Sequence, residues 1–282
     1  GIGSPRASNE ANFALRSFVG AENYFSGHSD AEHEALQVLI ECLRDAAFHS
    51  PSVRQIEQAD AILVLGEDVT NTAPRIALAL RQSVRNEAKA LAETSRIPSW
   101  QDAAVRELAQ ESLSPLAVFA CGSTRLDDIA TTKLNADQQT LIEASNALSE
   151  RLAGRSPAYS QQTLGTTMQS VEATYTALMS AKKPLVICGT GAGAALMRCA
   201  ANIARALSVS RSKVCDLVLL PKEDNSVGHA LLTSKENTLS RALGRLANGE
   251  VKRAIVIEND LFERAPTALV KNALAAAELL VI

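Results

Sequence analysis

Short runs of apolar residues, each four or five residues long, recur along the chain between longer stretches of mixed polarity. Such runs are typical of strands buried on both faces, as in a parallel sheet. We predict strands at 61–65, 116–120, 184–188, 217–220, 254–257 and 279–282.

The stretches between these runs carry apolar residues at the spacing of amphipathic helices. In the first of them Ser8 or Asn9 can cap the helix, and Leu15, Phe18 and Val19 fall on one face. The predicted helices lie at 8–20, 31–47, 74–84, 135–153, 168–178, 194–207, 236–247 and 265–277, and a capping box at 99–102 opens another. This alternation predicts an α/β fold of two doubly wound, mostly parallel-sheet lobes with helices on both faces.

A change in composition near the middle of the chain predicts the domain boundary. The stretch 154–160 is rich in Gly, Ser and Pro, which is typical of a linker. We therefore expect a first lobe at 1–157 and a second, Rossmann-like lobe at 158–282. The chain starts without Met and stops inside an apolar run, so we expect the first lobe to be incomplete at its N-terminus and the second truncated at its C-terminus.

Composition narrows the functional classes. The 282 residues are 46% hydrophobic and 21% charged, which supplies a sizeable core and excludes global disorder. The net charge of −3 lacks the basic excess of a nucleic-acid binder. No apolar run is long enough for a membrane span, and no signal peptide is visible. The five scattered cysteines contain no C-x-x-C pair, so we expect buried thiols in a reducing compartment.

The most visible motif is the glycine-rich stretch 189–194, which follows a predicted strand and opens a predicted helix. It matches G-x-G-x-x-A, a variant of the dinucleotide-binding fingerprint. The ribose-binding acid expected about 20 residues on is missing, because Asp216 and Glu223 lie too far along. Two interpretations follow: a working NAD site, or a tight strand-to-helix turn with or without a vestigial ligand.

Three groups of polar residues have the residue types of metal-binding or catalytic sites, but their spacing favours structural or surface roles. The cluster His28, Asp30, Glu32, His33 and Glu34 has metal-ligand residue types, yet its two histidines are five apart and do not share a helix face, so we expect a solvated loop and helix start and no metal site. Ser226 and His229 lack a nucleophile-elbow motif. The acidic pairs are interpreted as surface or strand-end carboxylates: Asp127, Asp128, Glu258 and Asp260.

Several segments together carry a resemblance to a known superfamily. The start, GSPRASNEANF at 3–13, resembles the G-S-x-R-x-T/S-N-E-E-N-Y signature of the molybdopterin oxidoreductases. The segment DAILVLGEDV at 60–69, which leads to Pro74, resembles their strand and G-x-N-P-x-x-x-x-P turn. The segments KPLVICG at 183–189, NSVG at 225–228 and VKRAIVIEND at 251–260 fit later blocks of that family. Within this superfamily, the sequences of residues 64–70 and 1–6 are particularly similar to the large iron–sulfur subunit of bacterial NADH–quinone oxidoreductase, respiratory complex I.

This resemblance implies the fold of formate dehydrogenase domains 1–3 and a role in electron transfer from NADH to quinone. It implies a parent subunit with [4Fe-4S] and [2Fe-2S] clusters on cysteine sets outside this chain. The implied partners are the other subunits of the complex I peripheral arm, on the cytoplasmic side of the bacterial inner membrane, without direct membrane insertion. In catalytic family members, a pterin dinucleotide lies between two α/β lobes.

The chain departs from the family where that cofactor binds. The first strand-end turn has Glu67 and Asp68 in place of a neutral Asn, and the last offers Glu258 and Asp260 in place of Gly and Asn. Carboxylates repel a pyrophosphate. We therefore expect no catalytic residues, no molybdopterin and a degenerate, vestigial cofactor site, to which we assign Gly66, Asp68, Gly189, Thr190, Gly191 and Gly193. The rival hypotheses are a catalytic, formate-dehydrogenase-like molybdenum enzyme and an NAD-binding module.

Overall fold

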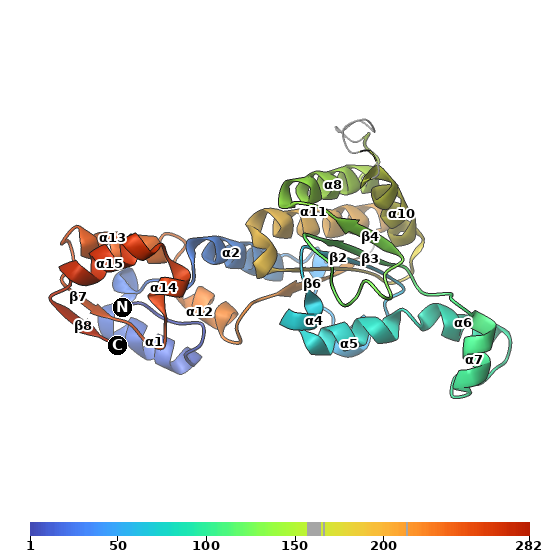
Figure 1. Ribbon diagram of the computed structural model, residues 1–282, viewed down its shortest axis with the longest axis horizontal. Helices are drawn as coiled ribbons and strands as arrows, with labels where there is room; N and C mark the ends of the chain where they lie inside the picture. Colours follow the sequence, from blue (N-terminus) through green and yellow to red (C-terminus); the bar gives the residue numbers. More distant parts are fainter. Residues whose placement is uncertain (157–164, 166, 213) are drawn as a thin grey trace. The chain divides into compact units, whose positions relative to one another are not determined.

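The computed structural model describes residues 1–156, 165, 167–212 and 214–282 (Figure 1). The chain forms two compact units, one of residues 42–220 and one in which residues 1–41 associate with 221–282. This division differs from the expected boundary between 157 and 158, because strands from both sides of that boundary pair in one sheet. Most of the expected linker, residues 157–160, lies outside the described residues.

The contiguous unit, residues 42–220, is built on a six-stranded sheet with the order β1-β6-β5-β2-β3-β4. Every neighbouring pair in this sheet is parallel. The strands are β1 (Phe48–His49), β2 (Ala61–Leu65), β3 (Leu116–Ala120), β4 (Thr132–Asn135), β5 (Pro184–Gly189) and β6 (Cys215–Leu220). From β2 the chain proceeds to β3 on one side, and from β5 to β6 on the other, so the order reverses between β2 and β5.

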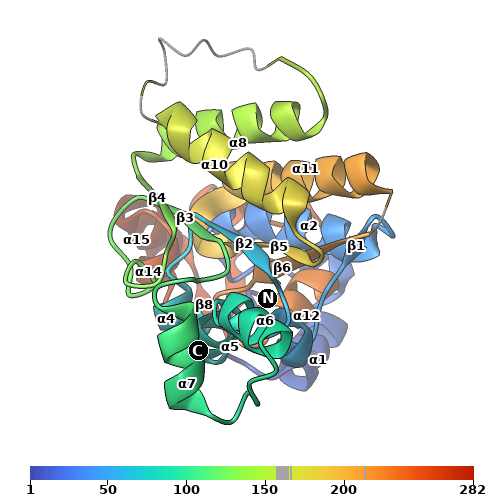
Figure 2. The ribbon, with the colours of Figure 1, turned by 90° about the vertical axis from the view of Figure 1, so that its right-hand side faces the viewer.

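Helices cover both faces of this sheet. Figures 1 and 2 show α8, α10 and α11 on one face and α4 and α5 on the other. The helices are α3 (Val53–Ile56), α4 (Val69–Thr72), α5 (Pro74–Ser83), α6 (Asn86–Thr94), α7 (Asp102–Ala109), α8 (Gln138–Leu152), α10 (Thr167–Ser180) and α11 (Gly193–Arg211). On the α5 side, Ile62 and Val64 of β2 pack with Leu80 in a continuous apolar core.

The discontinuous unit, residues 1–41 with 221–282, is mostly helical around a two-stranded parallel sheet. Its elements are α1 (Asn9–Val19), a 3₁₀ turn (Ala21–Asn23), α2 (Asp30–Arg44), α12 (Ser226–Leu232), α13 (Leu239–Ala247), β7 (Arg253–Ile255), α14 (Leu261–Arg264), α15 (Thr267–Ala276) and β8 (Leu279–Val281). Helix α2 continues three residues past the unit's boundary. Ile2 forms bridges with Phe25 and Val256, which ties the first residues to the last segment through a shared core.

The predicted strands are present, but they do not form two comparable sheets. Strands β5 and β6, expected in a second lobe, join β2 in the large sheet, and only β7 and β8 form the small one. The short edge strands β1 and β4 were missed because they alternate in exposure and have no continuous apolar run. Four of the cysteines are buried as expected, whereas Cys121 is exposed.

Candidate functional site

The order reversal between β2 and β5 is where open α/β sheets place ligands, at the carboxyl ends of the strands. The register pairs Leu65 with Cys188, so Gly66 and Gly189 end neighbouring strands. Gly66 has φ +68°, and a Cβ there would lie 2.8 Å from the Ala192 Cβ. The predicted glycines are therefore brought together at the expected edge of the sheet.

The Glu67 side chain fills this edge. It is 6% exposed, although it directly follows a strand end. A Cβ added to Gly189 would lie 1.8 Å from the Glu67 Oε2, and one added to Gly191 would lie 3.5 Å from the same oxygen. The absence of side chains at Gly189 and Gly191 thus leaves room for a carboxylate of the protein itself.

The environment of Glu67 disfavours its charged form. Burial raises the pKa of the Glu67 carboxyl, and hydrogen bonding to Thr72 and the Asp68 backbone offsets only part of this effect. Burial, and then the Glu67 charge, raise the pKa of the neighbouring Cys188 thiol. A carboxyl group beside the glycine-rich loop, when ionised, repels a phosphate group. The residues at this strand end do not fit a phosphate-bearing cofactor.

The remaining predicted site residues have local structural roles. The Asp68 carboxylate caps α4 by accepting from the Thr70 N–H at 3.2 Å, and it also accepts from the Asn71 side chain. Gly193, with φ +83°, begins α11 after the 3₁₀ turn Thr190–Ala192. Thr190 is buried, and its hydroxyl has no hydrogen-bond partner among the described residues.

A second polar cluster lies in the discontinuous unit, and it corrects one expectation. His28, Glu32 and His33 are not solvated: they are exposed by 0%, 9% and 2% respectively. They are covered because residues 221–282 return against the loop before α2, a contact between segments far apart in the chain. Asp30 and Glu34 are exposed, as expected.

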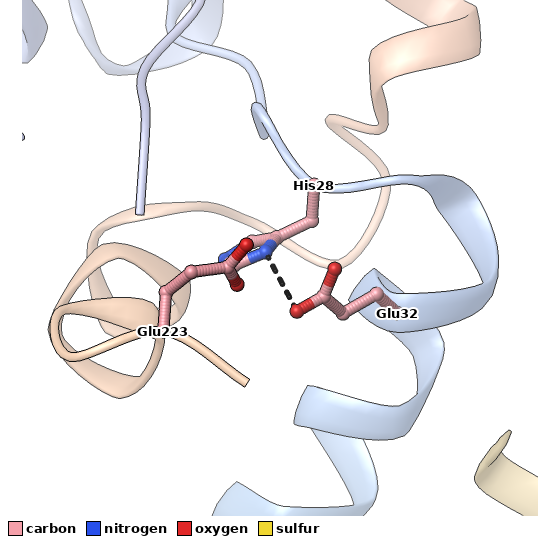
Figure 3. Close-up of side chains that lie close together, drawn as sticks. All are labelled: His28, Glu32 and Glu223. Atoms are coloured by element: carbon pink, nitrogen blue, oxygen red, sulfur yellow. Dashed lines mark ion pairs between the residues drawn. The ribbon is translucent and has the colours of Figure 1, made fainter. Parts of the chain in front are cut away.

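Within this cluster, His28, Glu32 and Glu223 point toward one another (Figure 3). The His28 Nδ1 lies 3.4 Å from the Glu32 Oε1. The Arg264 guanidinium, 5% exposed, contacts the Glu32 Oε2 at 3.2 Å and the Glu223 Oε1 at 2.5 Å. Burial raises the pKa of Glu32, but contact with His28 and the Arg264 charge outweigh it and bring that pKa below its usual value.

Next to this cluster, His229 belongs to a closed hydrogen-bond chain. The Gly27 N–H donates to its Nε2 at 3.0 Å, which leaves the ring proton on Nδ1, 2.8 Å from the Tyr24 hydroxyl. That hydroxyl then donates to the Asn12 Oδ1 at 2.8 Å. Burial, with the neighbouring histidine charges, lowers the pKa of His229 to about 3, so the ring is neutral.

The other sequence candidates show no catalytic arrangement. Both ring nitrogens of His229 are engaged, and the Ser226 hydroxyl lies 3.3 Å from the Glu223 Oε2 instead, so these two residues form no nucleophile–base pair. Asp128 forms a surface ion pair with Arg81 at 2.9 Å. Asp260 caps α14 by accepting from a backbone N–H, and the Glu258 carboxylate is exposed.

Sequence reasoning missed Arg264 and the contribution of Glu223 to the buried cluster. The available signal was the spacing of His28 and Glu32, four residues apart, which brings side chains together near a helix start. The two histidines, His28 and His33, are five residues apart, and that spacing alone does not indicate the His28–Glu32 pair. Nothing in the local sequence indicates Arg264, because it is brought in from more than 200 residues away.

Over its whole length, the chain is similar in sequence to the same subunit of several bacteria. It is 40% identical over 285 residues to the NADH-quinone oxidoreductase G subunit of Pseudomonas fluorescens. It is 42% identical over 284 residues to the G subunit of Shewanella oneidensis and 39% identical over 284 residues to that of Escherichia coli K12. Each match covers 100% of this chain and 31% of the relative, so the chain spans about a third of their length. The chain is homologous throughout to part of the G subunit.

Two further comparisons bear on the fold alone. No family model matches the chain. A crystal structure of a formyltransferase/hydrolase complex from Methylorubrum extorquens, in complex with methylofuran, superposes with a TM-score of 0.51. At 13% identity, with 90% of this chain and 67% of that chain covered, the likeness shows a shared α/β fold. Across the described part of the chain, none of the helices has the length and apolar character needed to span a membrane.

Proposed function

We propose that this chain, homologous to part of the G subunit of NADH-quinone oxidoreductase, is a non-catalytic structural region of that protein. In this proposal it supports electron transfer from NADH to quinone in the peripheral arm of complex I. The iron–sulfur clusters that carry the electrons lie on cysteine sets outside this chain. Its partners are other subunits of the arm, at the cytoplasmic side of the bacterial inner membrane.

The observation that carries the proposal is the buried Glu67 carboxyl group at the β2–β5 strand ends. A catalytic molybdopterin enzyme needs this region of the sheet to accept an anionic cofactor, with free backbone N–H groups and positive or neutral surroundings. Here the space next to Gly189 and Gly191 is taken by a group that competes with phosphate in both shape and charge. The loop is thus a degenerate site with no role in chemistry.

The same geometry weighs against an NAD-binding module. In a dinucleotide site, the glycines of the loop let the backbone approach the pyrophosphate. In this chain the Gly189 backbone approaches the Glu67 side chain. The helix that follows, α11, begins at Gly193. The carbonyl oxygen of the preceding residue, Ala192, accepts a hydrogen bond from the Gln138 side chain at 3.1 Å.

A substitution at Glu67 in the full-length protein, assembled in its native complex, tests the structural role. Glu67→Gln keeps the shape of the side chain and removes its charge. We expect the assembled complex to transfer electrons from NADH to quinone at the wild-type rate, because no reacting group is changed. The wild-type complex and its cluster signals by electron paramagnetic resonance serve as the control for assembly. A variant with normal clusters but a more than tenfold lower rate would contradict the proposal.

A further inference from the structure

The buried cluster of the discontinuous unit contains three side chains with metal-ligand atoms. His28 comes from the loop before α2, Glu32 from the first turn of α2, and Glu223 from the segment before α12 (Figure 3). One ligand atom from each lies within 4.8 Å of the other two. His28 and Glu32 are buried, and the Glu223 side chain is 15% exposed.

The polar atoms at the centre of the cluster lack hydrogen bonds to other described residues, although the His28 Nδ1 and the Glu32 Oε1 form an ion-pair contact at 3.4 Å. Among the described residues, neither ring nitrogen of His28 has a hydrogen-bond partner, and the same is true of the Glu32 Oε1. His28 is 0% exposed, so water at the protein surface does not satisfy these nitrogens. Buried polar groups normally have partners, and an orphaned histidine aimed at a carboxylate therefore indicates a ligand between them.

The spacing of these atoms fits coordination better than hydrogen bonding. The His28 Nδ1 and the Glu32 Oε1 are 3.4 Å apart. Two ligands at about 2.1 Å from a tetrahedral zinc ion are separated by about 3.4 Å. One oxygen of the Glu223 carboxylate lies within 4.8 Å of both atoms, so small side-chain movements can bring all three ligand atoms to a single ion.

The surrounding charges leave the necessary oxygens available. Arg264 contacts the Oε2 of Glu32 and the Oε1 of Glu223, which leaves the Oε1 of Glu32 and the Oε2 of Glu223 directed elsewhere. The Ser226 hydroxyl lies 3.3 Å from the latter oxygen. The two carboxylates outnumber the single guanidinium, and a divalent cation offsets the excess negative charge. Arg264 and Ser226 thus orient the carboxylates as supporting groups do around bound metals.

Of the two neighbouring histidines, His229 has partners at both ring nitrogens. The His33 Nε2 lies 3.1 Å from the Lys235 carbonyl oxygen, and its Nδ1, which has no hydrogen-bond partner among the described residues, is not among the ligand atoms that lie within 4.8 Å of one another. The donor set therefore consists of one imidazole and two carboxylates, with a further position for water. Nitrogen and oxygen ligands in this number suit zinc better than magnesium or calcium, which prefer oxygen alone.

We propose that His28, Glu32 and Glu223 bind one zinc ion, which ties the start of α2 to the segment before α12. The role is structural: the ion links two parts of the unit that are nearly 200 residues apart in the chain. This inference is independent of the proposed function, since it concerns the other unit and involves no electron transfer.

The test measures zinc in the full-length protein, produced without a histidine tag in zinc-supplemented medium and passed over a weak chelating resin. Elemental analysis is expected to give one zinc per chain for the wild type. His28→Ala and Glu32→Gln are expected to weaken zinc binding at least 100-fold in competition with a fluorescent zinc chelator. His33→Ala is the matched control, because it removes a buried histidine of the same region and is expected to keep the zinc.

Folding is followed separately, so that a loss of zinc is not mistaken for a loss of structure. Zinc is expected to raise the melting temperature of the wild type and of His33→Ala but not that of Glu32→Gln, whose side chain keeps its shape. A wild-type protein that retains no zinc and shows no zinc-dependent melting shift would overturn the proposal in favour of a metal-free ion network. Zinc that is bound equally by the wild type and Glu32→Gln would also overturn it.

Discussion

At the scale of single residues, Glu67 has the greatest influence on what the large sheet can bind. Its carboxyl group is almost fully buried at the strand ends where this class of sheet holds its ligands. Burial of an ionisable group costs free energy unless the group is paired or neutral. No ion-pair partner of Glu67 is present among the described residues, and its raised pKa reflects this cost.

Neutralising Glu67 is therefore expected to stabilise the protein in a pH-dependent way. The folded pKa lies above the unfolded value of 4.5, so the folded state binds more protons than the unfolded state between the two pKa values. The free energy of unfolding of the wild type then falls as pH rises through this window. Glu67→Gln should be more stable than wild type at pH 8, by on the order of 1 kcal/mol, and equal to it near pH 4. Chemical denaturation at several pH values measures the difference.

Two outcomes of the denaturation experiment would contradict this explanation of the Glu67 pKa. If Glu67→Gln is less stable than wild type at neutral pH, the carboxylate is held by favourable charge interactions. If the difference does not depend on pH, Glu67 does not titrate with an altered pKa. The surface pair of Asp128 with Arg81 supplies a control, because Asp128→Asn should change stability by less than about 1 kcal/mol.

The buried histidine cluster shows the limits of residue-level prediction. The sequence identified Glu67 as a departure from the family pattern, because the neighbouring motif fixed what to expect at that position. Nothing comparable indicated that His28 and Glu32 are buried. Their burial depends on residues 221–282 closing over them, and no local pattern around position 28 contains that information.

At the scale of elements, the approach of two strand ends explains the glycines better than a ligand does. The end of β5 passes so close to the Glu67 side chain that any side chain at 189 would require the Glu67 carboxyl group to move. Gly66 is required for a different reason, since its positive φ and its contact with Ala192 both exclude a side chain. Close packing therefore accounts for Gly66 and Gly189 of the two turns without a bound ligand.

A double-mutant cycle tests this explanation of Gly189. Gly189→Ala places a Cβ against the Glu67 carboxylate, so we expect a loss of roughly 2 kcal/mol in the free energy of unfolding. In a Glu67→Ala background the clash is absent, and the same substitution should cost clearly less. Urea denaturation of the four proteins measures the coupling. Equal costs in the two backgrounds would mean that Glu67 does not fill the space beside Gly189.

The sequence predicted central elements well and peripheral ones less well, for a physical reason. Strands β2 and β3 are buried on both faces, so their continuous apolar runs can be read directly. Strands β1 and β4 lie at the sheet edges and carry mixed patterns. The assignment of β5 and β6 to a separate lobe failed because strand pairing is decided by the whole sheet and not by distance along the chain.

At the scale of the whole molecule, the chain forms one contiguous unit and one discontinuous unit. Residues 42–220 contain all six strands of the large sheet together with the helices of both its faces. The sequence-based lobe 158–282 contains only β5 and β6 of that sheet. Without β2, one edge of β5 and its apolar residues would be exposed.

The two divisions of the chain predict different folding behaviour. Residues 42–220, produced alone, are expected to unfold in a single cooperative transition, because they carry a complete sheet and core. Residues 158–282, produced alone, are expected to lack such a transition. Thermal melting followed by circular dichroism compares the two. Cooperative unfolding of 158–282 together with failure of 42–220 to fold would favour the boundary at 157.

The central claim is that this region, homologous to part of the NADH-quinone oxidoreductase G subunit, is structural and holds no pterin cofactor. The most direct measurement is the molybdenum, tungsten and pterin content of the full-length protein, with a catalytic molybdopterin enzyme purified in parallel as the positive control. We predict neither metal nor pterin above background, because Glu67 occupies the strand-end position beside Gly189. One molybdenum or tungsten per chain, with an equivalent amount of pterin, would contradict the claim.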